Sequence, residues 1–264
     1  KAESVVRERV AMIPSEEEML SAAMGGSVEP QQQTRQRVKL SVKHGHLAYA
    51  SYPVLAGHYL GDTLNGTEKV LDRREDGRLG KRRVLGIYPG AIETCDVFID
   101  EKLQPQGSLV VGLGETSELT RGNLKRTLQH GLLNLAASRS EYDATRRQRK
   151  PDAFEPLPRG VSCLLVGSGE GVVALEDCVT AILLAVQQAN RLLDESIAYE
   201  FVEIIELVEQ QAVNAWHALR GRLERAEFSH SFVLDGRVRQ AKGAWRRIGP
   251  ERDASWWTPI TITA

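Results

Sequence analysis

The sequence has little that would tie it to a disulfide framework, a metal or a membrane. Only three residues are cysteine, none has CxxC spacing, and each lies in or beside an apolar stretch: Cys95, Cys163 and Cys178. This pattern argues against disulfides and a zinc knuckle and predicts buried thiols. No window approaches the roughly 18 apolar residues of a membrane span, and the start lacks the order of a signal peptide. We therefore expect a cytoplasmic protein.

An excess of one charge is also missing. Lys and Arg total 34, Asp and Glu total 35, and the formal net charge is -1. Such a balanced chain has no overall basic field to attract nucleic acid or an acidic membrane surface. Three tryptophans lie near arginines at the end of the chain, and this composition favours a protein or domain interface over stacking on nucleic acid. We expect a protein partner, with no membrane and no nucleic acid.

The composition divides the chain into two parts. Residues 15–24 carry a helix-capping pattern, and residues 25–37 are rich in glycine and glutamine, so we expect an N-terminal helix and linker over residues 1–37. Residues 38–264 form the predicted main domain. The chain begins with Lys1, and residues 259–264 alternate apolar and polar side chains as at the entry of a strand. We interpret the chain as a segment of a longer polypeptide.

Apolar periodicity predicts an α/β domain. Residues 108–111 and 161–166 are short apolar runs, and each leads through a glycine-rich loop into a helical pattern. Alternation at residues 38–42 and 47–55 predicts an initial hairpin or meander, and Asp235-Gly236 between apolar runs predicts a further hairpin. The expected fold has three layers, with a mostly parallel sheet, helices on both faces and an added hairpin. Residues 142–159 are basic and proline-containing, and we expect a mobile, exposed connection there.

Three loops are the candidate ligand or partner site, because parallel strands direct their carboxyl ends to one edge of the sheet. Neither of the two loops between the predicted strands and helices completes a dinucleotide or P-loop pattern. Tight turns with close packing are therefore one interpretation, and a ligand loop is the other. The candidate residues are Gly57, His58, Gly61 and Asp62; Gly112, Gly114 and Glu115; and Gly167, Ser168, Gly169 and Gly171.

Two further groups contain reactive side-chain types without a convincing pattern. His44, His46, His58 and Asp62 include metal-ligating types, but a solvated or hydrogen-bonded histidine is the commoner case. Cys95 has no neighbouring histidine in the sequence that would activate it. We therefore predict no metal, no cofactor and no catalytic residue in this chain.

Two resemblances narrow the function. Residues 107–124 resemble the amino-terminal domain of leucyl aminopeptidases, which has a macrodomain-like fold and lacks the catalytic groups of those enzymes. This resemblance implies a fold and no reaction.

Most of residues 38–260 resemble a region of large bacterial multidomain proteins that carry a CHAT domain, a caspase-like protease. The resemblance rests on residues 52–62, 85–90, 112–115, 118–120 and 165–169 and on the pair Trp256-Trp257. It implies a non-catalytic regulatory or sensing module for that protease in a bacterial defence or cell-death system. The protease residues would then follow Ala264.

Two other functions stay open. In one, the converging loops bind a nucleotide-like or ADP-ribose-like molecule and hydrolyse it with Asp62 or Glu115 and a water. In the other, the chain is a structural module that forms oligomers. Convergence of the three loops on one pocket is the observation that would favour a ligand.

Overall fold

The computed structural model describes residues 36–149, 151–168 and 172–244. The chain divides into two compact units, Lys1–Arg35 and Gln36–Ala264, and the described residues belong to the second. The predicted helix at residues 15–24, nearly all of the predicted linker and the three C-terminal tryptophans lie outside the described residues.

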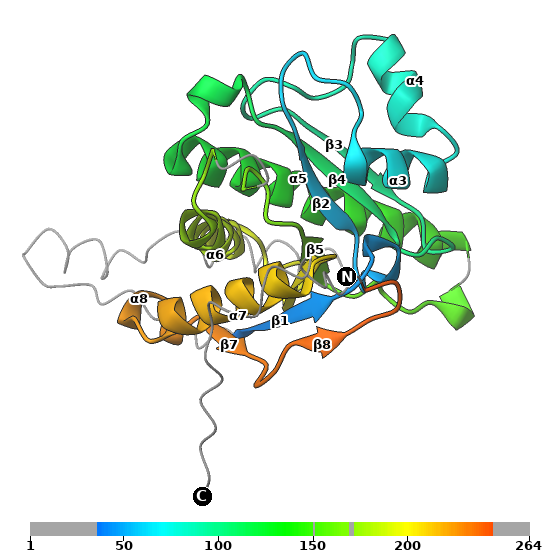
Figure 1. Cartoon of the computed structure of the whole chain (residues 1–264). Coiled ribbons are helices and arrows are strands. Elements are labelled where there is room, and N and C mark those ends of the chain that lie inside the picture. Colours follow the sequence, from blue (N-terminus) through cyan, green and yellow to red (C-terminus); the bar gives the residue numbers. More distant parts are fainter. Residues whose placement is uncertain (1–35, 150, 169–171, 245–264) are drawn as a thin grey trace, which may run out of the picture. The chain divides into compact units, whose positions relative to one another are not determined.

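One mostly parallel sheet forms the centre of the second unit (Figure 1). Its strand order is β3-β4-β2-β5-β6-β1-β7, and β8 also pairs with β1. Only the β3–β4 pair is antiparallel among the described strands. The strands are β1 (Val38–His44), β2 (Val54–His58), β3 (Cys95–Ile99), β4 (Gly107–Gly112), β5 (Gly160–Cys163), β6 (Phe201–Glu206), β7 (Phe232–Leu234) and β8 (Arg239–Gln240).

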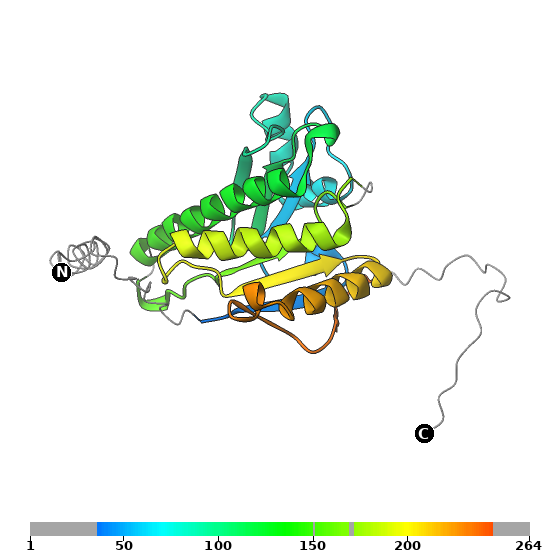
Figure 2. The ribbon, with the colours of Figure 1, turned by 90° about the vertical axis from the view of Figure 1, so that its left-hand side faces the viewer.

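Helices cover both faces of this sheet, which confirms the predicted α/β class. One face packs against α5 (Arg121–Arg149), α6 (Leu175–Leu192) and α7 (Glu209–Leu223), which lie in a row in Figure 2. The other face packs over β2 and β4 against α3 (Gly66–Arg74) and α4 (Arg78–Val84). Short helical turns complete the unit: η1 (Leu47–Tyr49), η2 (Thr116–Glu118), η3 (Pro151–Ala153) and α8 (Ala226–Ser229).

The residue pattern explains why the central elements form. All six residues of β4 and all four of β5 are buried, as expected for strands covered on both faces. Along β1 the buried and more exposed residues alternate, because only one of its faces lies in the core. Thr120 caps α5, since Asn123 N–H donates to Thr120 Oγ1 at 3.2 Å.

Both predicted hairpins are wrong. β1 and β2 do not pair, because β5 and β6 lie between them in the sheet. β7 and β8 pair with β1 in parallel and not with each other, so the segment containing Asp235-Gly236 interrupts a single sheet edge. In both cases a strand finds its neighbour far away in the sequence, and local turn residues carry no signal of that pairing.

The prediction of a mobile, exposed connection over residues 142–159 is wrong for residues 142–149, which are helical. α5 continues to Arg149. Arg146 Nη1 lies 2.9 Å from Asp143 Oδ1 within this helix, and Leu157 N–H donates to the same carboxylate at 3.0 Å. Leu157 is buried, so the returning segment packs against the helix.

Candidate functional site at the carboxyl ends of the strands

The predicted loops from β2, β4 and β5 meet at one edge of the sheet, which we call the crest. These three strands are parallel neighbours in the order β4-β2-β5. At their carboxyl ends lies a cavity of about 220 Å³. It is lined by Ala56, Gly57, Tyr59, Thr67, Leu113, Leu164, Leu165, Val166 and Gly167. The predicted convergence is therefore present in the described residues.

The crest cavity opens because β2 and β5 separate early. Their pairing consists of Val54 with Ser162 and Leu55 with Cys163, and it ends there. The chain after β2 leads to α3 on one face, whereas the chain after β5 leads to α6 on the other. Divergence of this kind creates a crevice at the carboxyl ends of α/β sheets.

Several of the candidate glycines are needed for close packing. A Cβ atom on Gly57 would lie 2.4 Å from Val166 Cγ1, and one on Gly112 would lie 2.0 Å from the carbonyl oxygen of Ala91. Gly167 has a φ of +83°, which disfavours residues with a side chain. These contacts match the packing interpretation of the loops. The ligand interpretation therefore depends on the cavity and not on the glycines.

The remaining candidates lie around the crest without forming a catalytic group. Asp62 and Glu115 are exposed, and neither lines the cavity. Gly61 and Gly114 belong to the same two loops, which are joined by the bond from Leu60 N–H to Gly114 O. Ser168 Oγ donates to Leu165 O at 2.7 Å and closes a turn. Gly169 and Gly171 lie outside the described residues.

His58 belongs to a buried polar trio that the sequence did not reveal. His58 Nδ1 lies 2.8 Å from Glu68 Oε1, and Tyr88 O–H donates to the same oxygen at 2.7 Å. The rings of His58 and Tyr88 meet edge to face, with 4.8 Å between their centroids. Burial, together with the bond to Glu68, raises the pKa of Tyr88. The trio ties the end of β2 to α3 and to the segment around Tyr88.

A half-buried carboxylate lies beside the crest cavity at the end of β6. Burial raises the pKa of Glu206, and the hydrogen bond from Leu165 N–H to Glu206 Oε1 at 3.1 Å opposes this shift. No pattern in the sequence indicates this contact, because Leu165 follows β5 and Glu206 ends β6. Glu206 is a positioning group for the loop after β5.

The cysteines are not activated. Cys163 and Cys178 are buried, and burial raises the pKa of Cys178 to about 12. Cys178 Sγ donates to Val166 O at 3.1 Å. Burial also raises the pKa of the half-buried Cys95, so its thiol is protonated at neutral pH. These environments support a structural role for all three thiols.

Among the described residues, no helix combines the length and the apolar character needed to span a membrane. In the same part of the chain, no three His, Cys, Asp or Glu side chains form a group that could hold a metal ion. Of the histidines considered as ligands, His46 caps η1, where its Nδ1 accepts from Ala48 N–H at 3.1 Å.

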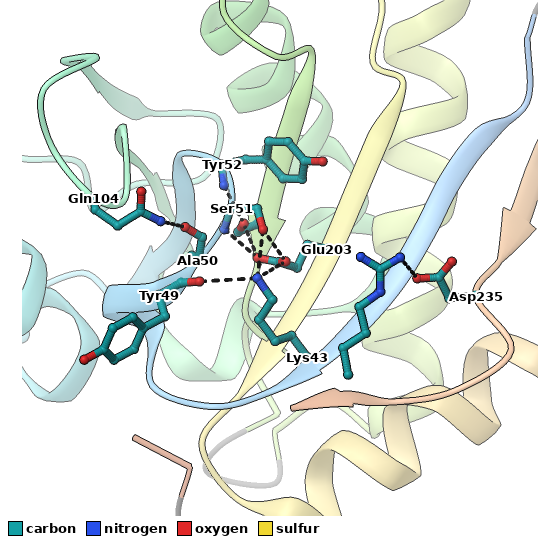
Figure 3. Close-up of polar contacts among 10 residues, drawn as sticks. Lys43, Tyr49, Ala50, Ser51, Tyr52, Gln104, Glu203 and Asp235 are labelled. Atoms are coloured by element: carbon teal, nitrogen blue, oxygen red, sulfur yellow. Dashed lines mark hydrogen bonds and ion pairs between the residues drawn. The ribbon is translucent and has the colours of Figure 1, made fainter. Parts of the chain in front are cut away.

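Glu203 of β6 is a buried carboxylate with partners on both of its oxygens (Figure 3). Glu203 receives hydrogen bonds from Ser51 N–H at 2.8 Å, Ser51 Oγ at 2.9 Å and Ser162 Oγ at 2.8 Å. Lys43 Nζ lies 2.6 Å from its Oε2. The cluster ties the segment between β1 and β2 to β6 and has a structural role in that connection.

Comparisons with known proteins give a structural likeness only. No family model matches the chain, and a search of curated proteins finds no match. The similar solved structures include a macrodomain of Oceanobacillus iheyensis with ADP, at 11% identity and a TM-score of 0.45, covering 69% of this chain and 90% of that one. A Trypanosoma brucei macrodomain in complex with ADP has 13% identity, a TM-score of 0.47 and 69% coverage of each chain. The macrodomain of Thermus aquaticus DarG has 17% identity, a TM-score of 0.39 and coverage of 63% and 97%.

The α/β class of this chain rests on the sheet order and the helix layers described above. No comparison and no described contact bears on an associated caspase-like protease, so that association stays a prediction.

Proposed function

We propose that this chain is a binding module whose crest cavity receives the planar group of a nucleotide-like small molecule. The observation that carries the proposal is the early separation of β2 and β5, which leaves a cavity at the point where their loops turn to opposite faces. Small-molecule sites in α/β sheets form preferentially at such points.

The size and lining of the cavity limit the ligand. Ligand pockets commonly measure roughly 300–1,000 Å³, so the crest cavity of about 220 Å³ holds one group of a ligand and not the whole molecule. Its wall is largely apolar, with Tyr59 and Thr67 as the polar-tipped members. Such a wall suits a flat base, whose face is apolar and whose edge carries hydrogen-bonding groups.

Charge on the surrounding loops directs the rest of the ligand. Asp62, Glu115 and Glu118 are exposed on the loops after β2 and β4, and they repel an anionic phosphate placed close to them. A nucleoside or a nucleotide with its phosphates directed away from these carboxylates therefore fits best. None of the described residues of the wall is an acid, a histidine or a cysteine, and we propose binding without hydrolysis.

The test fills the cavity from the half-buried Thr67 in the first turn of α3. Adenosine, ADP and ADP-ribose are suitable probes in calorimetry, because they share one base and differ in charge. Thr67→Trp should weaken their binding by at least about tenfold, or about 1.4 kcal/mol. Thr63→Trp is the matched control, because Thr63 is exposed and outside the cavity, and it should bind as the wild type does.

Two results would contradict the proposal. One is a wild-type protein that binds none of the three probes at concentrations up to about 1 mM. The other is equal binding by Thr67→Trp and the wild type, with both proteins folded to the same thermal midpoint. The regulatory role toward a caspase-like protease stays a separate prediction, and no described contact favours it.

A further inference from the structure

A second and larger cavity lies at the opposite edge of the sheet, which we call the base. Its volume is about 720 Å³, within the range of roughly 300–1,000 Å³ common for ligand pockets. The C-terminal half of α5, residues 154–159 and residues 196–200 form its walls. The amino ends of β5 and β6 follow directly, so this cavity is distinct from the crest in both position and residues.

Arg139 is the buried charge of the base cavity. Arg139 is 4% exposed, and its Nη2 donates to Ile197 O at 2.6 Å. Its guanidinium also lies 5.2 Å from the ring centroid of Tyr199. Nη1 has no hydrogen-bond partner among the described residues. A buried cation with an unsatisfied donor lowers the stability of the fold unless an anion or another acceptor contacts it.

The two acids of the base cavity are already bound to other groups. Asp143 accepts from Arg146 and from Leu157 N–H. Glu200 pairs with Arg159. Neither acid forms an ion pair with Arg139. Burial lowers the pKa of Arg139, and the charges of Asp143 and Glu200 oppose this shift only in part.

A second arginine of the same cavity also lacks an acidic partner. Arg147 lies over the ring of Phe154, with 4.6 Å to the centroid, and it is exposed. In the part of the chain that the structure describes, neither Arg139 nor Arg147 forms an ion pair. The cavity therefore combines two guanidinium groups that form no ion pair, two acids that are bound to other groups, and an apolar wall.

We propose that the base cavity binds a small organic phosphate. Arg139 and Arg147 hold the phosphate, and the wall of Phe154, Leu157 and Ile197 contacts the organic part. The planar guanidinium fork matches phosphate oxygens with two parallel hydrogen bonds, and two such groups suit a dianion. The site is independent of the crest and of the function proposed for it.

The experiment measures binding of phenyl phosphate, inorganic phosphate, benzoate and phenol to the whole chain by calorimetry at low salt. Phenyl phosphate should bind most tightly, and phenol should not bind. Arg147→Gln should weaken the binding of phenyl phosphate roughly tenfold, which is the loss of affinity expected for one charged hydrogen-bonding group. Arg149→Gln is the matched control, because Arg149 lies on the same helix, is exposed and does not line the cavity. It should bind within about twofold of the wild type.

Three outcomes would overturn the site. The first is no binding of phenyl phosphate at concentrations up to about 10 mM. The second is equal weakening by Arg147→Gln and Arg149→Gln, which would mean attraction to general surface charge. The third is binding of benzoate as tight as that of phenyl phosphate, which would exclude selection of a dianion. Arg147 is exposed, so Arg147→Gln leaves the packed core unchanged, and the thermal midpoint of each variant without ligand verifies its fold.

Discussion

The crest lies at the carboxyl ends of the strands and the base at their amino ends, and the cavities at these two places differ in size and lining. At the crest, loops converge and their glycines bring backbone and side chains into close contact, so the cavity is small and apolar. At the base, α5 is longer than the strands that it covers. Its 29 residues extend about 44 Å, whereas the six residues of β4 extend about 20 Å. The last buried residue of α5 is Arg139, and the helix beyond it borders a larger, arginine-lined cavity.

The largest expected effect comes from the sheet between the two edges, where a buried charge has all its partners. Glu203→Ala would leave Lys43, Ser51 and Ser162 without their shared acceptor. We expect a loss of about 3–5 kcal/mol in the free energy of unfolding, measured by urea denaturation. Glu203→Gln keeps an acceptor oxygen and should lose less. A loss below about 1 kcal/mol for Glu203→Ala would show that full pairing there has little energetic weight.

An intermediate effect separates packing from ligand binding at the crest. A Cβ on Gly112 would meet the oxygen of Ala91 at 2.0 Å, so Gly112→Ala should lower the free energy of unfolding by about 1–3 kcal/mol. Gly122→Ala is the control, because a Cβ there meets nothing closer than Thr120 Oγ1 at 3.8 Å. It should be neutral or stabilising by up to about 1 kcal/mol. Equal stability of the two variants would argue against the packing interpretation.

The smallest effect is a pH dependence at the crest. Burial raises the pKa of Glu206 above its ordinary value of 4.5, so the folded state binds this proton more tightly than the unfolded state. The associated stabilisation is complete below about pH 4.5 and is lost as the pH rises through the folded-state pKa.

Glu206→Gln cannot lose this proton and can still offer an oxygen to Leu165 N–H. The variant should therefore gain stability relative to the wild type as the pH rises across that window. Thermal midpoints of both proteins from about pH 4 to about pH 8 measure the difference. A difference that stays constant with pH would show that Glu206 does not carry the effect.

The sequence predicted those elements whose signal is local. β4, β5 and α6 follow apolar runs and helical periodicity. Asn65 caps α3, and Glu68 completes a capping box there. The convergence of loops at the crest also followed from topology, because parallel neighbours share an edge.

The base cavity could not be predicted, because its parts are joined by contacts across the sequence. The helix over residues 142–149 has few apolar residues, and pairs such as Arg146 with Asp143 and Glu101 hold it in place. Arg139 meets Ile197, 58 positions away. The His58–Glu68–Tyr88 trio is non-local in the same way, since a histidine in a strand carries no sign of its partner.

The two short strands on the outer side of β1 have a consequence for association between chains. An open sheet edge offers unpaired backbone groups to any extended segment that can lie along it. Here the edge consists of three residues in β7, an interruption, and two residues in β8, one of which is the exposed Arg239. Strand addition needs a longer continuous ladder and tolerates charge poorly, so this edge protects the protein against aggregation by strand pairing.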